Sequence, residues 1–163
     1  MRKITSFCVD HDVLLKGMYI SRVDGDVITY DLRMVTPNQP PYLDQKGLHT
    51  FEHLFATYVR NSQYSDQIIY VGPMGCRTGF YFLTRDSLSH ADAIALIQET
   101  MGFISTFEGD IPGAQESKEC GAYREHDLQS AKEMASAYFD VIKDYQVSQL
   151  DYEKTDESRF FIY

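Results

Sequence analysis

Residues 48–60 read LHTFEHLFATYVR and predict a single helix. At about 100° per residue, His49, Glu52 and His53 share one narrow sector of this helix, and mostly apolar side chains occupy the remainder. Such a helix is expected to be buried, and three titratable groups buried together are costly without a cation or hydrogen bonds. Two neutral imidazoles one turn apart are good metal ligands, so the stretch predicts a metal site.

The same spacing would also appear in an amphipathic helix whose two histidines face solvent. Glu52 and the surrounding apolar residues favour the metal site over this alternative. HxxEH is also the signature of inverted zinc peptidases, in which the glutamate acts as general base towards a metal-bound water. Taken alone, the motif predicts a metal-dependent hydrolase or lyase.

Apolar alternation and helical spacing divide the rest of the chain into further elements. The turn Asp24-Gly25-Asp26 joins two β-rich runs, which predicts a hairpin over residues 18–36. Ser89 and Asp92 resemble a capping box at the start of a helix that continues to about Ile104. The remaining elements are expected at residues 66–71 and 78–84, as strands, and at residues 127–145, as an amphipathic helix.

Strands come mostly early in the chain and helices mostly late, without regular alternation between them. This order predicts the α+β class, with an antiparallel β-sheet packed against α-helices. The length of 163 residues is that of one domain with a substantial core, so we expect a single domain over residues 1–163. Residues 146–163 are expected to form either a tail or a segment docked on a partner subunit.

Composition and charge narrow the classes of partner. The net charge of −9 would repel a phosphate backbone, so we expect no nucleic-acid partner. The N-terminal residues lack the apolar run of a secretory signal, and no apolar stretch of about 18 residues follows, so we expect a cytoplasmic protein without a membrane partner. Cys8, Cys76 and Cys120 form no CxxC pair, which favours reduced thiols.

Two of these cysteines are candidates for chemistry. Cys76 lies in the glycine-rich turn GPMGCR beside Arg77, and a nearby cation favours a thiolate, although a free cysteine is more often a small buried hydrophobe. Cys120 lies just ahead of the last predicted helix and is a candidate third ligand beside the two histidines. Three protein ligands would leave a fourth position open, as in catalytic sites, and zinc or ferrous iron would suit them.

The motifs taken together resemble the LuxS family. HxxEH alone is only moderately specific, but its combination with PMGCRTGFY and a later Cys-Gly is highly specific. The resemblance spans residues 6 to 128 and rests on Ser6-Phe7, Val9-Asp10-His11, Asp31-Leu32-Arg33, Pro37-Asn38, His49-Thr50, Glu52-His53-Leu54, Pro73 to Tyr81 and Cys120-Gly121.

The resemblance implies a metal site made of His49, His53 and Cys120, with one ion per subunit. Fe²⁺ would be the native ion, and Zn²⁺ or Co²⁺ would be able to replace it. Glu52 and Cys76 would be the catalytic acid–base pair.

The resemblance also implies where the substrate binds. Ser6, His11 and Arg33 would contact it, and the active sites would lie at the interface of a homodimer, with both chains contributing. The implied fold is distantly similar to the inverted zinc peptidases.

The implied activity is that of an S-ribosylhomocysteine lyase. The ribose opens, its carbonyl moves along the chain through enediolates, and homocysteine is eliminated β to the final ketone. The other product is 4,5-dihydroxy-2,3-pentanedione, the precursor of autoinducer-2. The reaction would therefore serve the activated methyl cycle of methionine metabolism and autoinducer synthesis in quorum sensing.

The strand ahead of PMGC departs from the family pattern. The family has an IIDIS-like run there, whereas this chain has Tyr70 in place of the aspartate and Gly72 in place of the serine. A catalytically lapsed, metal-binding family member is therefore one alternative. An HxxEH metallopeptidase is a weaker one, since those chains are larger, take a carboxylate as third ligand and would leave Cys76 idle.

Overall fold

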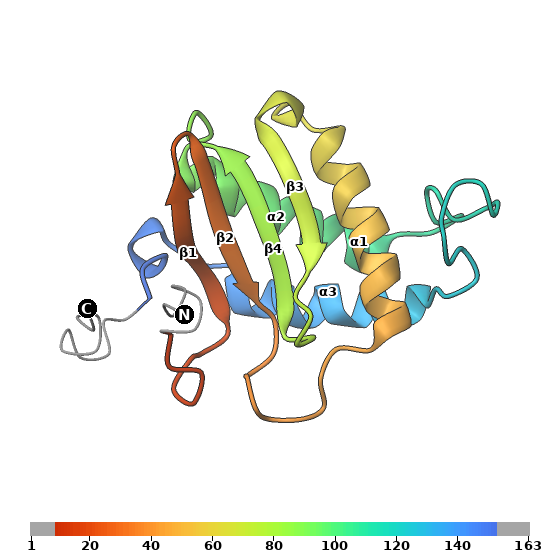
Figure 1. Cartoon of the computed structure of the whole chain (residues 1–163), viewed down its shortest axis with the longest axis horizontal. Helices are drawn as coiled ribbons and strands as arrows, with labels where there is room; N and C mark the ends of the chain where they lie inside the picture. The colour runs from red at the N-terminus through yellow and green to blue at the C-terminus, as the bar shows by residue number, and fades with distance from the viewer. Residues whose placement is uncertain (1–8, 153–163) are drawn as a thin grey trace, which may run out of the picture.

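A computed structural model describes residues 9–152, which form a four-stranded antiparallel sheet with helices behind it (Figure 1). This arrangement confirms the predicted α+β class. In chain order the elements are β1 (Gly17–Asp24), β2 (Val27–Arg33), α1 (Gln45–Arg60), η2 (Ser65–Gln67), β3 (Ile68–Pro73), β4 (Gly79–Arg85), α2 (His90–Thr106), α3 (Leu128–Ile142) and η3 (Val147–Gln149).

The sheet has the strand order β1-β2-β4-β3, and each neighbouring pair is antiparallel. The predicted hairpin is β1–β2, in which Asp24 pairs with Val27 across a turn where Gly25 has a φ of 61°. Glycine adopts this left-handed conformation without the steric cost that a side chain would bring. The strand expected from residue 66 begins at Ile68 instead, because residues 65–67 form the 3₁₀ turn η2.

Side-chain caps fix where the helices begin. The carboxylate of Asp44 accepts a hydrogen bond from the backbone of Gly47, so α1 starts at Gln45, three residues before the predicted start. Ser89 caps α2 by accepting from the backbone of Asp92, as the capping-box pattern predicts. Asp127 caps α3 in the same way.

Aromatic packing between α1 and β4 sets the orientation of α1. The ring of Phe51 lies 4.8 Å from that of Phe80, and the ring of Phe55 lies 5.7 Å from that of Phe82. All four side chains are fully buried. Because this face of α1 is fixed against the sheet, the opposite face, which carries the HxxEH motif, points away from it.

The segment after α3 packs on its own sheet. The backbone of Ile20 in β1 donates to the carbonyl of Leu150, and the ring of Tyr152 stacks on that of Tyr19 at 4.5 Å. The first part of the predicted tail or docking segment therefore covers β1 of the same chain. Residues 153–163 lie outside the described residues, as do Ser6 and Cys8.

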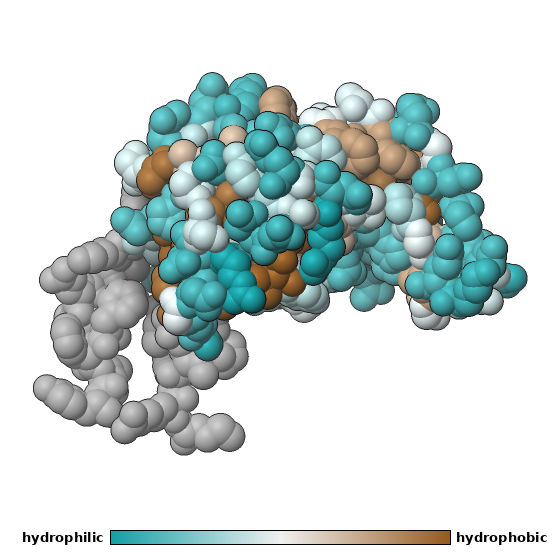
Figure 2. Space-filling view, turned by 90° about the horizontal axis from the view of Figure 1, so that it is seen from above, coloured by the Kyte–Doolittle hydropathy of each residue, from teal (hydrophilic) through white to brown (hydrophobic). Residues whose placement is uncertain are grey.

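The molecular surface is mainly polar where Figure 2 shows it. Hydrophilic residues cover most of that face, and hydrophobic areas show between them. In the described part of the chain, no helix combines the length and the apolar character needed to cross a bilayer.

Candidate metal centre and active site

Helix α1 presents the three polar residues of the motif on one face. His49, Glu52 and His53 are all half-buried, whereas Leu48, Phe51 and Leu54 on the rest of the helix are buried. These three polar side chains are thus less buried than the apolar pattern of α1 predicts. The segment that covers them, residues 107–127, is an irregular loop.

This loop, which connects α2 to α3, completes a cluster of potential metal ligands. One ligand atom from each of His49, His53, Cys120 and His126 lies within 4.8 Å of the others. The Sγ atom of Cys120 is 3.3 Å from Nε2 of His49. Zinc–nitrogen and zinc–sulfur bonds of roughly 2.0–2.3 Å in a tetrahedral site place two ligand atoms at about this separation. The predicted trio therefore converges, together with a histidine that the prediction did not include.

Backbone carbonyls orient two of the imidazoles. Nδ1 of His49 donates to the carbonyl of Glu125 over 2.9 Å, and Nδ1 of His53 donates to that of Pro112 over 2.8 Å. In these tautomers Nε2 of each ring carries a lone pair that could bind a metal ion, and Nε2 of His49 faces Sγ of Cys120. Histidine metal ligands commonly make this outer hydrogen bond, so the donor set fits a divalent cation.

His126 is the residue that the sequence prediction missed. It follows Cys120 by six residues and directly precedes the cap of α3. Burial, together with the neighbouring imidazoles of His49 and His53, lowers the pKa of His126 to about 4. A neutral ring suits a place beside a cation. A histidine close after the candidate cysteine ligand was the one signal available in the sequence.

Cys76 lies apart from the cluster, in the turn between β3 and β4. Its thiol is exposed, and Sγ is 3.0 Å from the hydroxyl of Thr78, which also accepts a hydrogen bond from Nη1 of Arg33 over 3.1 Å. A hydroxyl polarised by Arg33 can donate to a thiolate and stabilise it. The guanidinium of Arg77 instead lies over the ring of Tyr42, so Arg33 is the cation linked to this thiol.

Arg33 is part of a buried charged network. Its side chain pairs with Asp31 at 2.9 Å, and the hydroxyl of Tyr152 donates to the same carboxylate oxygen over 2.6 Å. Burial and the adjacent Asp31 raise the pKa of Tyr152, which keeps its hydroxyl protonated. Nε of Arg33 and Oδ1 of Asp31 are buried without a partner among residues 9–152. Such atoms are rare in native proteins, so Nε of Arg33 is a donor that still needs an acceptor.

The other two predicted substrate contacts are not brought to the cluster. His11 is half-buried, donates from Nδ1 to the carbonyl of Val9 and does not belong to the four-residue cluster. It lies on the segment before β1, at one edge of the sheet, whereas α1 packs on β3 at the other edge (Figure 1). Ser6 lies outside the described residues.

The two departures from the family pattern are physically coupled. Tyr70 is half exposed, and its ring folds over Gly72, where an added Cβ would lie only 2.3 Å from the tyrosine hydroxyl oxygen. A serine at position 72 would therefore displace this ring. Tyr70 and Gly72 form one unit in this chain, and each accommodates the other.

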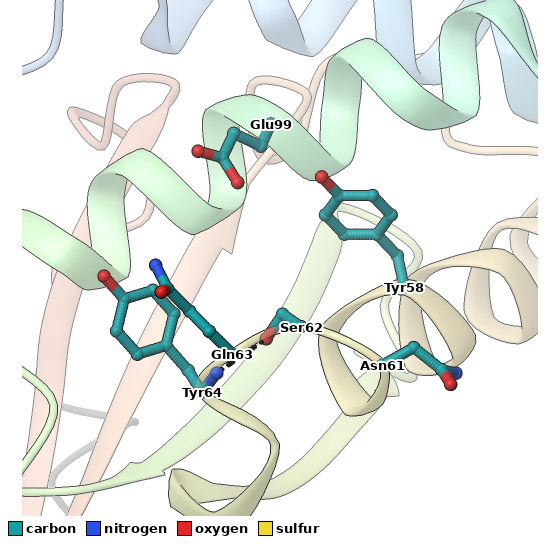
Figure 3. Close-up of a pocket in the computed structure, with 6 residues that line it drawn as sticks. All are labelled: Tyr58, Asn61, Ser62, Gln63, Tyr64 and Glu99. Carbon is teal, nitrogen blue, oxygen red and sulfur yellow. Dashed lines mark hydrogen bonds between the residues drawn. The ribbon is translucent and has the colours of Figure 1, made fainter.

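A cavity of about 360 Å³ lies elsewhere, between the end of α1 and α2 (Figure 3). Tyr58 and Glu99 point towards each other across it, and no residue of the metal-ligand cluster lines it. The cavity is thus separate from the candidate metal centre. Its other lining residues are Asn61, Ser62, Gln63 and Tyr64.

Comparison with known proteins agrees with this geometry. The chain matches the family model described as S-Ribosylhomocysteinase (LuxS) over residues 4–149. The S-ribosylhomocysteine lyase of Phocaeicola vulgatus is 45% identical over 162 residues, which cover 96% of this chain and 100% of the relative. The lyases of the same name from Porphyromonas gingivalis and Desulfotalea psychrophila are 47% and 45% identical over 149 residues, 88% of this chain and 93% of each relative. With a motif-bearing helix, a converging His/Cys cluster and these matches in agreement, the chain belongs to the LuxS family of S-ribosylhomocysteinases.

Proposed function

We propose that this chain is an S-ribosylhomocysteine lyase, a carbon–sulfur lyase that yields homocysteine and 4,5-dihydroxy-2,3-pentanedione, the autoinducer-2 precursor. The observation that carries the proposal is that two cysteines have different surroundings. Cys120 lies among histidines at ligand distance, whereas Cys76 is exposed and linked to a buried arginine. This arrangement supplies one thiol to bind an ion and a second, separate thiol to exchange protons with a substrate.

His49, His53 and Cys120 are the proposed metal ligands, with Fe²⁺ as the native ion and Zn²⁺ or Co²⁺ as substitutes. The bound ion supplies Lewis-acid polarisation of a sugar carbonyl or hydroxyl. The carbonyl oxygens of Glu125 and Pro112 hold the two rings in the tautomer that this role requires.

Cys76 and Glu52 are the proposed acid–base pair. Sγ of Cys76 takes a proton from one carbon and returns it to the neighbouring carbon, while the Thr78 hydroxyl stabilises the thiolate between the two steps. Glu52 moves protons between the sugar oxygens and then protonates the leaving sulfur. The shift of the carbonyl is an internal isomerisation, so no external oxidant is needed, and each proton transfer contributes roughly 10²–10⁴-fold to the rate.

The substrate contacts are proposed to come from Arg33, His11 and Ser6. The unpartnered Nε of Arg33 supports the first of these. His11 stays on the segment before β1, so a homodimer in which the partner supplies His11 would complete the site. We assign the whole chain, residues 1–163, to one cytoplasmic enzyme domain of this kind.

The test is release of homocysteine. Anaerobically purified protein loaded with Fe²⁺ is incubated with S-ribosylhomocysteine, and the new thiol is measured with a thiol-specific reagent against a Cys76→Ala control. The wild-type protein is expected to release one homocysteine per substrate consumed, and the variant none above background. Absence of release from the wild type loaded with iron, cobalt or zinc would contradict the proposed function.

A further inference from the structure

His126 is held beside the proposed metal ligands by Thr50 of α1. Its Nδ1 is 3.1 Å from the hydroxyl of Thr50, a fully buried residue of α1. The same hydroxyl accepts a hydrogen bond from the backbone of Asp127 over 2.9 Å and donates to the carbonyl of Lys46 over 3.0 Å. Thr50 thus ties the start of α3 to α1 and fixes the position of the imidazole between them.

This arrangement favours one tautomer of His126. A threonine hydroxyl has one proton, and when Thr50 donates it to the carbonyl of Lys46, Nδ1 of His126 is the donor in their contact. Nε2 then carries a lone pair. That atom is buried and has no hydrogen-bond partner among residues 9–152. Leaving a buried acceptor unpaired costs roughly 1–3 kcal/mol, so this nitrogen is expected to meet a proton donor or a cation in the working protein.

Ring geometry argues against His49 and His126 binding one ion together. Their rings stack with centroids 4.0 Å apart and planes 20° apart, whereas His53 is nearly perpendicular to both. The lone pair of an imidazole lies in the ring plane, so the lone pairs of stacked rings run side by side instead of converging. Because His49 is the ring in contact with Cys120, it is the better partner of that thiolate at the ion.

We propose that His126 is a positioning residue of the metal centre. Its ring supports His49 from one side, and its Nε2 accepts a hydrogen bond from the proton-bearing group in the fourth coordination position. The inference rests on the proposed metal centre of His49, His53 and Cys120, and it goes further by assigning a role to a fourth side chain. In the reaction, that proton-bearing group would be a hydroxyl of the sugar.

The test uses two small probes on the cobalt-loaded protein, titrated by visible absorption. Bound hydroxylamine keeps protons that it can donate, whereas thiocyanate has none. His126→Phe keeps a flat ring beside His49 but removes the acceptor, and His126→Gln restores an acceptor oxygen. His90→Phe is the control, since His90 contacts Tyr30 and lies outside the cluster.

His126→Phe is expected to bind one cobalt per chain with the thiolate-to-cobalt absorption unchanged, and to bind hydroxylamine about 10-fold more weakly, at the low end of outer-contact effects. Thiocyanate binding should change by less than about 2-fold. His126→Gln should recover part of the hydroxylamine affinity, and His90→Phe should match the wild type.

Other outcomes overturn the proposal in distinguishable ways. Loss of cobalt or a changed coordination spectrum in His126→Phe would make His126 a ligand. Equal weakening of both probes, or of neither, would show that Nε2 accepts no proton from the fourth position. A wild-type protein that binds no cobalt would remove the proposed metal centre itself, and this inference with it.

Discussion

The metal-ligand cluster and the Cys76 network handle charge in opposite ways. In the cluster, three imidazoles are oriented by two backbone carbonyls and a hydroxyl, and one ligand atom of each ring lies within 4.8 Å of the others and of the Cys120 thiol. In the network, Arg33 and Asp31 already form an ion pair, with 4% and 3% of their surfaces exposed. The cluster therefore offers uncharged donor atoms that could bind a cation, whereas the thiol site has a cation of its own in Arg33. Substitutions in the two regions should consequently have separable effects.

The largest expected effect is a different loss on replacing each of the two cysteines. Cys76→Ala should lower kcat/KM by at least about 10³-fold and leave metal content at one ion per chain, because Cys76 acts only in proton transfer. Cys120→Ala should lose the ion and the activity together, since it removes one of three ligands. Elemental analysis and homocysteine release measure the two properties.

The unfolding midpoint of both variants provides a control for misfolding. Equal loss of metal in the two variants would mean that both thiols serve one centre, and the division of labour proposed for them would then be wrong.

The next largest effect is expected at Glu52, the proposed acid–base group for the sugar oxygens. Glu52→Gln keeps the shape of the side chain and removes its titration, so kcat should fall by roughly 10²–10⁴-fold. Substrate affinity and metal content should change little, which binding of S-ribosylhomocysteine and elemental analysis can check. A variant that keeps full kcat would remove Glu52 from the mechanism.

A smaller effect is expected for the link between Arg33 and Cys76. Thr78→Val removes the hydroxyl that joins them, so kcat should fall by about 10-fold or more, as for other outer contacts of a reactive group, and metal content should stay the same. Thr84→Val is the matched control, because Thr84 is a buried threonine of β4 outside this network. If both variants lose equal activity, the loss comes from altered packing and not from a less stable thiolate at Cys76.

The smallest effect is expected for the departure from the family pattern. The ring of Tyr70 lies over Gly72, and among residues 9–152 Tyr70 belongs neither to the metal-ligand cluster nor to the hydrogen bond of Cys76. Tyr70→Asp and the double variant with Gly72→Ser should therefore stay within about 3-fold of wild-type kcat/KM, as is usual for exposed positions away from special features. A large gain from an inactive wild type would instead support the catalytically lapsed alternative.

Local patterns allowed much of the fold to be predicted. Helical spacing located α1, α2 and α3, and the Asp-Gly turn located the β1–β2 hairpin, because each depends on neighbours in sequence. The HxxEH pair was also predictable, since residues four apart on a helix share a face whatever surrounds it. The start of α1 was missed because it depends on a cap at Asp44, ahead of the apolar repeat.

The rest of the site depends on how distant segments meet. His126 was missed because nothing local shows that the loop after α2 folds back onto Thr50. The link from Cys76 through Thr78 to Arg33 was likewise unpredictable, since it arises from the register of β2 and β4, which sets Arg33 opposite Gly79 and beside Thr78. Sequence position favoured Arg77 as the neighbouring cation, whereas the fold turns that side chain towards Tyr42.

The most direct test of the proposed metal centre is X-ray absorption spectroscopy of the zinc-loaded protein at the zinc edge. We expect one sulfur scatterer at about 2.3 Å and nitrogen or oxygen scatterers at about 2.0–2.1 Å, with the sulfur absent from the spectrum of Cys120→Ala and retained in that of Cys76→Ala. A spectrum without sulfur in the wild-type protein, or one that keeps sulfur in Cys120→Ala, would contradict an ion shared by His49, His53 and Cys120.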